Sequence, residues 1–253
     1  KAIELNPNFA DAHSNLGNIL QALGQLKDAE LATRKAIELN PGFTKSHLNL
    51  GSILQVQGKL KDAELATRKA IQLNPNFADA HSNLGMILKA LGKLKEAEIY
   101  ARKAIQIDPK IALAYSNLGI ILRSLGKLKE AEIYARKAIQ IDPEIAMAQS
   151  NLGIILKDLG KLKESELLHK KAIEIQPDYA DAYFNLSYLE LLRGEYKSGL
   201  ENYEFRLIKK ETPSIHGNPI ITRIDSQDLK KEEKLLVISE QGLGDTLQYM
   251  RYI

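Results

Sequence analysis

Apolar residues recur along the chain at separations of three and four, the spacing of one buried face on an α-helix. Between Asp79 and Leu91 the apolar positions are Ala80, Leu84, Ile87, Leu88 and Leu91. A second stretch, about Lys95 to Ile107, carries Ala97, Ala101, Ala104 and Ile105 on one face. Gly92 follows the first stretch and Asp108-Pro109 ends the second, as expected at helix ends. The pattern predicts two helices joined by a tight turn.

This unit is repeated along most of the chain. Six prolines stand 34 residues apart: Pro7, Pro41, Pro75, Pro109, Pro143 and Pro177. Such a period is typical of a repeat array, which grows by stacking neighbouring units. The predicted repeats span 10–43, 44–77, 78–111, 112–145, 146–179 and 180–206, and we interpret residues 1–9 as the end of a truncated repeat.

The small residues, the Leu-Gly pair, the turn glycine and the closing proline resemble the tetratricopeptide repeat in their offsets. The resemblance implies an all-α, right-handed superhelical solenoid of helix-turn-helix repeats. Small residues such as Gly85 and Ala97 would let the paired helices approach closely. The aromatic residue common at the fourth place of the repeat is present as Tyr115 and Tyr183 only. His13, His47, His81 and Gln149 replace it elsewhere.

These histidines do not predict a metal site. Equivalent residues of neighbouring repeats are separated by a helix packing distance of roughly 8–10 Å. Ligands of one zinc ion lie about 2 Å from the metal. We therefore expect neither a metal nor a cofactor.

The charges are nearly balanced, with 35 Lys and Arg against 32 Asp and Glu, a formal net charge of +3. In the second helices each glutamate precedes a basic residue by four positions, the favoured order for a pair on one helix. The pairs are Glu30-Arg34, Glu64-Arg68, Glu98-Arg102, Glu132-Arg136 and Glu166-Lys170. We interpret this as a solvated outer face and expect no nucleic-acid partner, whose binding needs clustered positive charge.

The compartment is predicted from composition. Cysteine is absent, which is compatible with a reducing cytosol, and no apolar run approaches the roughly 20 residues of a membrane span. We find no signal peptide and expect a cytoplasmic protein without membrane contact.

One polar position is the same in the first helix of all six repeats. We call it the asparagine row: Asn15, Asn49, Asn83, Asn117, Asn151 and Asn185. Asparagine is a mediocre helix former, because its amide competes for backbone groups. A side-chain amide both donates and accepts, so a row along a concave groove could hold the backbone of an extended peptide. Two alternatives are that the amides bond neighbouring repeats or only contact solvent.

Phrases such as FADAHSNLG and GKLKEAE are most similar to repeats of the O-linked N-acetylglucosamine transferases. That resemblance implies that the asparagine row lines the lumen and binds protein substrates. It also implies a lumen role for Asp11, Asp79 and Asp181. Lys45, Leu113 and Met147 break this aspartate pattern.

A second row on the same helices becomes basic in the middle repeats. It runs through Gln21, Gln55, Lys89, Arg123 and Lys157. We name Lys89, Arg123 and Lys157 the basic row and expect it to favour acidic partners.

The period ends after the sixth repeat. We interpret 207–234 as a connector, 235–239 (LLVIS) as a strand, and 241–245 as a tight turn before a helix. Gly242, Gly244 and Asp245 could belong to an incomplete nucleotide site, since a glycine-rich loop can expose N–H groups to phosphate. The segment resembles the start of bacterial glycosyltransferase-like domains. We expect a fragment cut at both ends, without transferase activity of its own, from a parent chain that could be a transferase.

Together these features predict a protein-interaction scaffold that binds peptides in its groove and recruits substrates for a larger glycosyltransferase-like protein. The alternative is a structural module in which exposed repeat ends stack with other copies.

Overall fold

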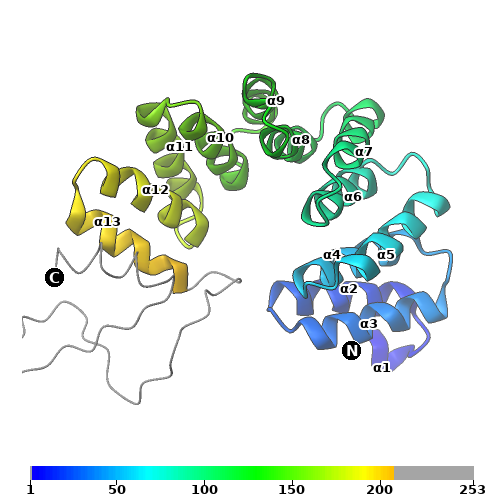
Figure 1. The fold of residues 1–253 in the computed structure, drawn as a ribbon. Coiled ribbons are helices and arrows are strands. Elements are labelled where there is room, and N and C mark those ends of the chain that lie inside the picture. The colour runs from blue at the N-terminus through cyan, green and yellow to red at the C-terminus, as the bar shows by residue number, and fades with distance from the viewer. Residues whose placement is uncertain (1, 208–253) are drawn as a thin grey trace, which may run out of the picture. The chain divides into compact units, whose positions relative to one another are not determined.

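The computed structural model describes residues 2–207, and every regular element in that range is a helix (Figure 1). The helices are α1 (Ala2–Leu5), α2 (Ala10–Ala22), α3 (Leu26–Leu39), α4 (Thr44–Val56), α5 (Leu60–Leu73), α6 (Ala78–Ala90), α7 (Leu94–Ile107), α8 (Ala112–Ser124), α9 (Leu128–Ile141), α10 (Ala146–Asp158), α11 (Leu162–Ile175), α12 (Ala180–Leu192), α13 (Tyr196–Tyr203) and a 3₁₀ turn (Glu204–Leu207). The all-helical prediction is confirmed for residues 2–207. The right-handed sense of the solenoid stays a prediction.

The chain divides into two compact units, Lys1–Ile175 and Gln176–Ile253. In the first unit each even-numbered helix from α2 to α10 pairs with the helix that follows it, and each pair packs against the next. The helices α2, α4, α6, α8 and α10 also contact one another in chain order. They form a continuous surface, which we call the first-helix face.

A glycine makes the turn inside each pair. Gly92 has φ of 76°, a left-handed conformation that costs glycine least. Its N–H donates to the Lys89 carbonyl at 3.0 Å, and the Lys93 N–H donates to the Leu88 carbonyl at 2.9 Å. These two bonds form a Schellman motif, which satisfies the last carbonyls of the helix. The predicted stop at this glycine is confirmed.

The core lies between the paired helices and continues from pair to pair. Leu84, Leu88, Leu118 and Leu122 are fully buried. A Cβ atom added to Gly85 would lie 3.2 Å from the carbonyl oxygen of Ala97, tighter than most real contacts. The predicted close approach of the two helices is therefore confirmed.

The described part of the second unit contains α12, α13 and the 3₁₀ turn. Tyr183 stacks on Phe205 with ring centroids 3.8 Å apart, so aromatic packing joins α12 to the turn. The predicted connector, the strand at 235–239, the glycosyltransferase-like segment and the residues Gly242, Gly244 and Asp245 lie outside the described residues.

Candidate functional site

Five members of the asparagine row belong to the first-helix face. Asn15, Asn49, Asn83, Asn117 and Asn151 come from α2, α4, α6, α8 and α10. Asn15 is exposed and the other four are half-buried. Asn185 is half-buried in α12 of the second unit.

Three of these amides bond the neighbouring repeat. The side-chain nitrogen of Asn117 donates to the Ser82 hydroxyl at 3.0 Å, and that of Asn151 donates to the Ser116 hydroxyl at 3.0 Å. Asn49 donates to Ser14 at 3.3 Å in the same way. The structural alternative is thus present at three positions, and these bonds connect successive first helices.

Each of these amides keeps binding capacity. A side-chain amide carries two N–H donors and a carbonyl acceptor, and the bond to serine uses one donor. Within residues 2–207, the side-chain carbonyl oxygens of Asn49, Asn117 and Asn151 accept no hydrogen bond. The asparagine row can therefore bond successive repeats and still offer carbonyl acceptors to a ligand.

Asn83 differs because its serine is missing. The residue that precedes it by 35 positions is Leu48, which cannot accept a hydrogen bond through its side chain. Over the described part of the chain, no side-chain hydrogen bond is found for Asn83. Asn83 therefore presents its whole amide.

A pocket of about 590 Å³ brings together four of the predicted site residues. Asp11 and Asn15 reach it from α2, Asn49 from α4, and Asp79 from the start of α6. Four members of the asparagine row and one aspartate do not line it: Asn83, Asn117, Asn151, Asn185 and Asp181. The four predicted residues that line it offer a ligand two carboxylates and two amides.

Sequence reasoning missed three further asparagines of this pocket, Asn18, Asn40 and Asn74. The side-chain oxygen of Asn40 accepts a hydrogen bond from the Gly42 N–H at 3.1 Å, and Asn74 accepts one from the Asn76 N–H at 3.1 Å. The Asn-Pro pairs at 40–41 and 74–75 were the available signal, because asparagine commonly makes such turns.

One member of the basic row, Arg123, has an acidic partner. Arg123 donates from Nε to the carboxylate of Asp158 at 2.6 Å, which joins α8 to α10. Lys89 and Lys157 are half-buried. The neighbouring repeat supplies this acid, and the expectation that the basic row favours acidic partners stays a prediction.

The histidines at the fourth position of the repeat each form a hydrogen bond to the turn that precedes their helix. Nε2 of His13, His47 and His81 lies 2.9 Å from the carbonyl oxygen of the proline six residues earlier, so the ring donates from this nitrogen. Gln149 makes the same bond to Pro143 at 2.8 Å. Within residues 2–207 no group of three or more His, Cys, Asp or Glu side chains is placed to hold a metal ion.

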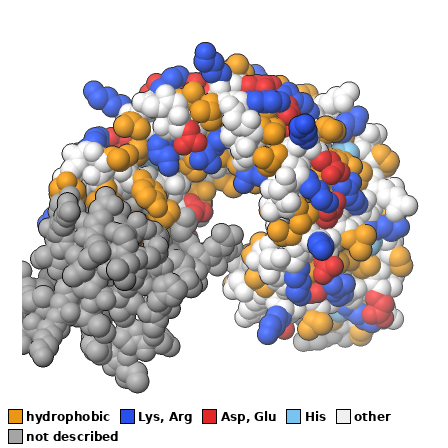
Figure 2. All heavy atoms as spheres, viewed as in Figure 1, with side chains coloured by type: hydrophobic (Ala, Val, Ile, Leu, Met, Phe, Trp, Pro, Cys, Tyr) orange, Lys and Arg blue, Asp and Glu red, His pale blue; other side chains and the backbone are white. Residues whose placement is uncertain are grey.

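The predicted pairs on the second helices are present, and four of the glutamates, Glu30, Glu64, Glu98 and Glu132, also bind a lysine of the next repeat. Glu64 contacts Arg68 at 2.8 Å in its own helix and Lys93 at 2.8 Å across the repeat boundary. At the equivalent Glu30, the hydrogen bond from Lys59 lowers the pKa to about 2. Figure 2 shows acidic and basic side chains mixed over the visible face. These basic residues are engaged in ion pairs and do not form an open cationic patch.

No helix in the described residues is long and apolar enough to cross a bilayer.

Solved structures support the fold. A chain of the APC/C hetero-tetramer Cut9-Hcn1 superposes with a TM-score of 0.73 at 15% identity, over 81% of this chain and 41% of that chain. The thermophilic protein TTC0263 of Thermus thermophilus gives 0.65 at 21% identity, over 76% of this chain and 99% of that chain. Pseudomonas aeruginosa PilF gives 0.61 at 18% identity, over 80% and 92%. This chain thus spans less than half the length of the APC/C chain.

No curated protein matches the chain. Sequence models of one family match five segments, residues 10–43, 44–77, 76–144, 145–176 and 170–201, and each is described as a tetratricopeptide repeat. This fold is typical of protein-protein interaction scaffolds and is typically non-catalytic. The chain belongs to the tetratricopeptide repeat family.

Proposed function

We propose that the first-helix face is a peptide-binding surface that holds an extended segment of a partner protein by its main chain. The pocket shared by Asp11, Asn15, Asn49 and Asp79 carries this proposal, because it places amides and carboxylates from three successive repeats around one space. The carbonyl oxygens of Asn117 and Asn151 would continue the row of acceptors. Each such bond contributes only about 0.5–1.5 kcal/mol, so several must act together.

The test distinguishes two roles of the asparagine amides, hydrogen bonding to a peptide and hydrogen bonding to the neighbouring repeat. A peptide selected from a random library on the 253-residue chain is titrated by calorimetry against two double variants. Asn15→Ala with Asn83→Ala removes amides that do not bond the neighbouring repeat. We expect binding to weaken by roughly tenfold or more, since two hydrogen bonds are lost.

The matched control is Ser82→Ala with Ser116→Ala, which removes the internal partners of Asn117 and Asn151 but keeps every amide. Peptide binding should persist in this variant while the melting temperature falls. A peptide N-methylated along its backbone should lose affinity for the unaltered chain. Equal binding by the methylated peptide, or by the Asn15 and Asn83 double variant, would refute main-chain recognition.

We also propose that this surface is the substrate-recruiting arm of a larger glycosyltransferase-like protein with a right-handed superhelical repeat array. The repeat phrases and the segment at 235–253 support this by resemblance to O-linked N-acetylglucosamine transferases and bacterial glycosyltransferase-like proteins. Sugar transfer from nucleotide sugars to the selected peptide, assayed with the full gene product, tests it. If the protein transfers sugar to a free acceptor but not to the selected peptide, the surface does not recruit substrates.

Self-assembly is the second candidate. Ile19 of α2 is 58% exposed, Leu23 just after this helix is 67% exposed and Phe9 just before it is 45% exposed, so α2 and its two ends carry exposed apolar surface. Sedimentation at rising concentration distinguishes this function. A single monomeric species throughout would exclude stacking through this end.

A further inference from the structure

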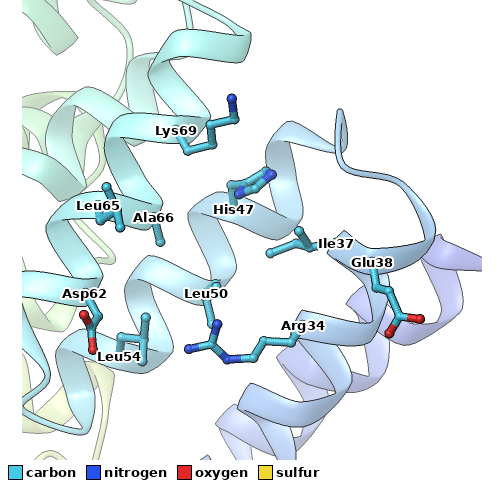
Figure 3. Close-up of a pocket in the computed structure, with 10 residues that line it drawn as sticks. All are labelled: Arg34, Ile37, Glu38, His47, Leu50, Leu54, Asp62, Leu65, Ala66 and Lys69. Atoms are coloured by element: carbon cyan, nitrogen blue, oxygen red, sulfur yellow. The ribbon is translucent and has the colours of Figure 1, made fainter.

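A second pocket, of about 580 Å³, lies between α3, α4 and α5 (Figure 3). Its walls include Arg34 and Ile37 from α3, His47, Leu50 and Leu54 from α4, and Ala66 from α5. It shares no residue with the pocket of the first-helix face. It is therefore a separate candidate site.

The repeat register shows why this space is open. Ala66 occupies the place that Tyr100 and Tyr134 occupy in the next two repeats, at spacings of 34 residues. The Tyr100 ring stacks on His81 with centroids 5.8 Å apart. Its hydroxyl accepts a hydrogen bond from Nη1 of Arg68 at 2.8 Å, and the guanidinium lies 5.2 Å from the ring centroid.

The walls of the pocket correspond to the surroundings of Tyr100. His47 is equivalent to His81 one repeat later, and Arg34 is equivalent to Arg68. Leu50 and Leu54 are likewise equivalent to Leu84 and Leu88. The first two repeats thus offer the environment of a tyrosine ring without the ring. We propose that the pocket between α3, α4 and α5 binds a tyrosine side chain of a partner protein.

Arg34 supplies the polar complement. It donates to Glu30 from Nε at 3.0 Å and from Nη2 at 2.9 Å. Among the described residues its Nη1 donates to no acceptor, whereas Nη1 of Arg68 and of Arg102 each binds a tyrosine hydroxyl at 2.8 Å. Arg34 can therefore place a charged donor on the phenol oxygen and its cationic plane beside the ring.

An exposed apolar row explains why the tyrosine would come from a polypeptide. Equivalent positions of five second helices carry large apolar side chains that are between 66% and 72% exposed: Leu31, Leu65, Ile99, Ile133 and Leu167. Leu65, the second member of the row, borders the pocket, so the row passes beside it. Residues flanking an inserted tyrosine could cover this apolar surface, which a free phenol would leave in water.

The experiment uses the 253-residue chain and two blocked amino acids, N-acetyl-tyrosine amide and N-acetyl-phenylalanine amide. NMR spectra follow the Ala66 methyl and the His47 ring during each titration. We expect the tyrosine probe to shift both signals and to bind more tightly than the phenylalanine probe. Arg34→Gln should weaken the tyrosine probe by roughly tenfold and the phenylalanine probe much less, because both rings lose the contact with the cation but only the phenol uses the charged donor.

Ala66→Tyr should fill the pocket, raise the melting temperature and abolish binding of the tyrosine probe. Ala22→Tyr, on an exposed part of α2, is the matched control and should leave binding unchanged. Unshifted Ala66 and His47 signals would overturn the proposal, as would equal affinity for both probes. If Ala66→Tyr fails to fold, the Arg34→Gln titrations decide alone.

Discussion

Asn117 donates a hydrogen bond from its side-chain amide to the Ser82 hydroxyl, 3.0 Å away in the preceding repeat. Asn151 makes the equivalent bond to Ser116, whereas Asn83 lacks it because the residue 35 positions earlier is Leu48. Residues that look identical in the sequence thus differ in their roles. The asparagine row joins repeats at some positions and leaves whole amides open at others.

This bond should be measurable in a double-mutant cycle of Asn117→Ala and Ser82→Ala. We expect a coupling of about 0.5–1.5 kcal/mol in the free energy of unfolding, the net value of one hydrogen bond. Asn83→Ala, without such a bond, should change stability by less than about 0.5 kcal/mol. Chemical denaturation gives both values, and a coupling near zero would mean that the serine contributes nothing.

Gly51 and Gly85 occupy equivalent places but should respond differently to alanine. A Cβ on Gly51 would meet the hydroxyl of Thr67, which is buried and bonded to the Ala63 carbonyl at 2.8 Å. We expect Gly51→Ala to cost about 1–3 kcal/mol, as overpacking does. Opposite Gly85 the threonine is replaced by Ala101, and Gly85→Ala should cost less.

Adding Thr67→Ala to Gly51→Ala tests this explanation, because the double variant has the same pair of alanines that Gly85→Ala makes with Ala101. Thermal unfolding should show that the second change restores most of the lost stability. Equal losses at Gly51 and Gly85 would point to backbone contacts as the cause.

Stability should fall in mild acid because of His169. The side chain is fully buried between α10 and α11, and burial, with a smaller effect of Lys157, lowers its pKa from 6.5 to about 4. The unfolded chain therefore binds the proton first. The stabilising effect of the neutral ring is complete above pH 6.5 and is lost as the pH falls toward 4, by up to about 3 kcal/mol.

Urea unfolding between pH 4 and 7 measures this slope. His169→Ala places at this site the residue found at the equivalent Ala135 and should flatten the profile in that window. Glu30 contributes a separate loss at lower pH, which sets in as the pH falls to the unfolded pKa of 4.5 and is complete below the folded pKa of about 2. An unchanged slope in His169→Ala would assign the acid sensitivity to other groups.

The hydroxyl of Tyr100 should stabilise the boundary between the second and third repeats. Tyr100→Phe removes the acceptor of the Arg68 bond at 2.8 Å and should cost about 1.5 kcal/mol, since the donor is charged. Tyr115 is buried, and its hydroxyl makes no hydrogen bond within residues 2–207, so Tyr115→Phe is a matched control with little expected effect. Thermal melts compare the two, and equal losses would contradict a role for the Arg68 bond.

Local rules predicted the repeated helices well. The turn glycine, the closing proline and the pair of Glu64 with Arg68 all act within about five residues, so the sequence contains everything needed to place them. The small residue at Gly85 likewise predicted the close helix approach. The role of the asparagine row could not be decided in the same way, because serine and asparagine meet across 35 residues.

The sequence by itself determined the period, the helical class and the buried face of each helix, because these follow from interactions along one or two turns. Only the tertiary structure decided which side chains meet across repeats, as with Arg123 and Asp158, or with Arg34 and the space beside Ala66. Those contacts depend on the rotation and translation between stacked helix pairs, which periodicity along the chain does not specify.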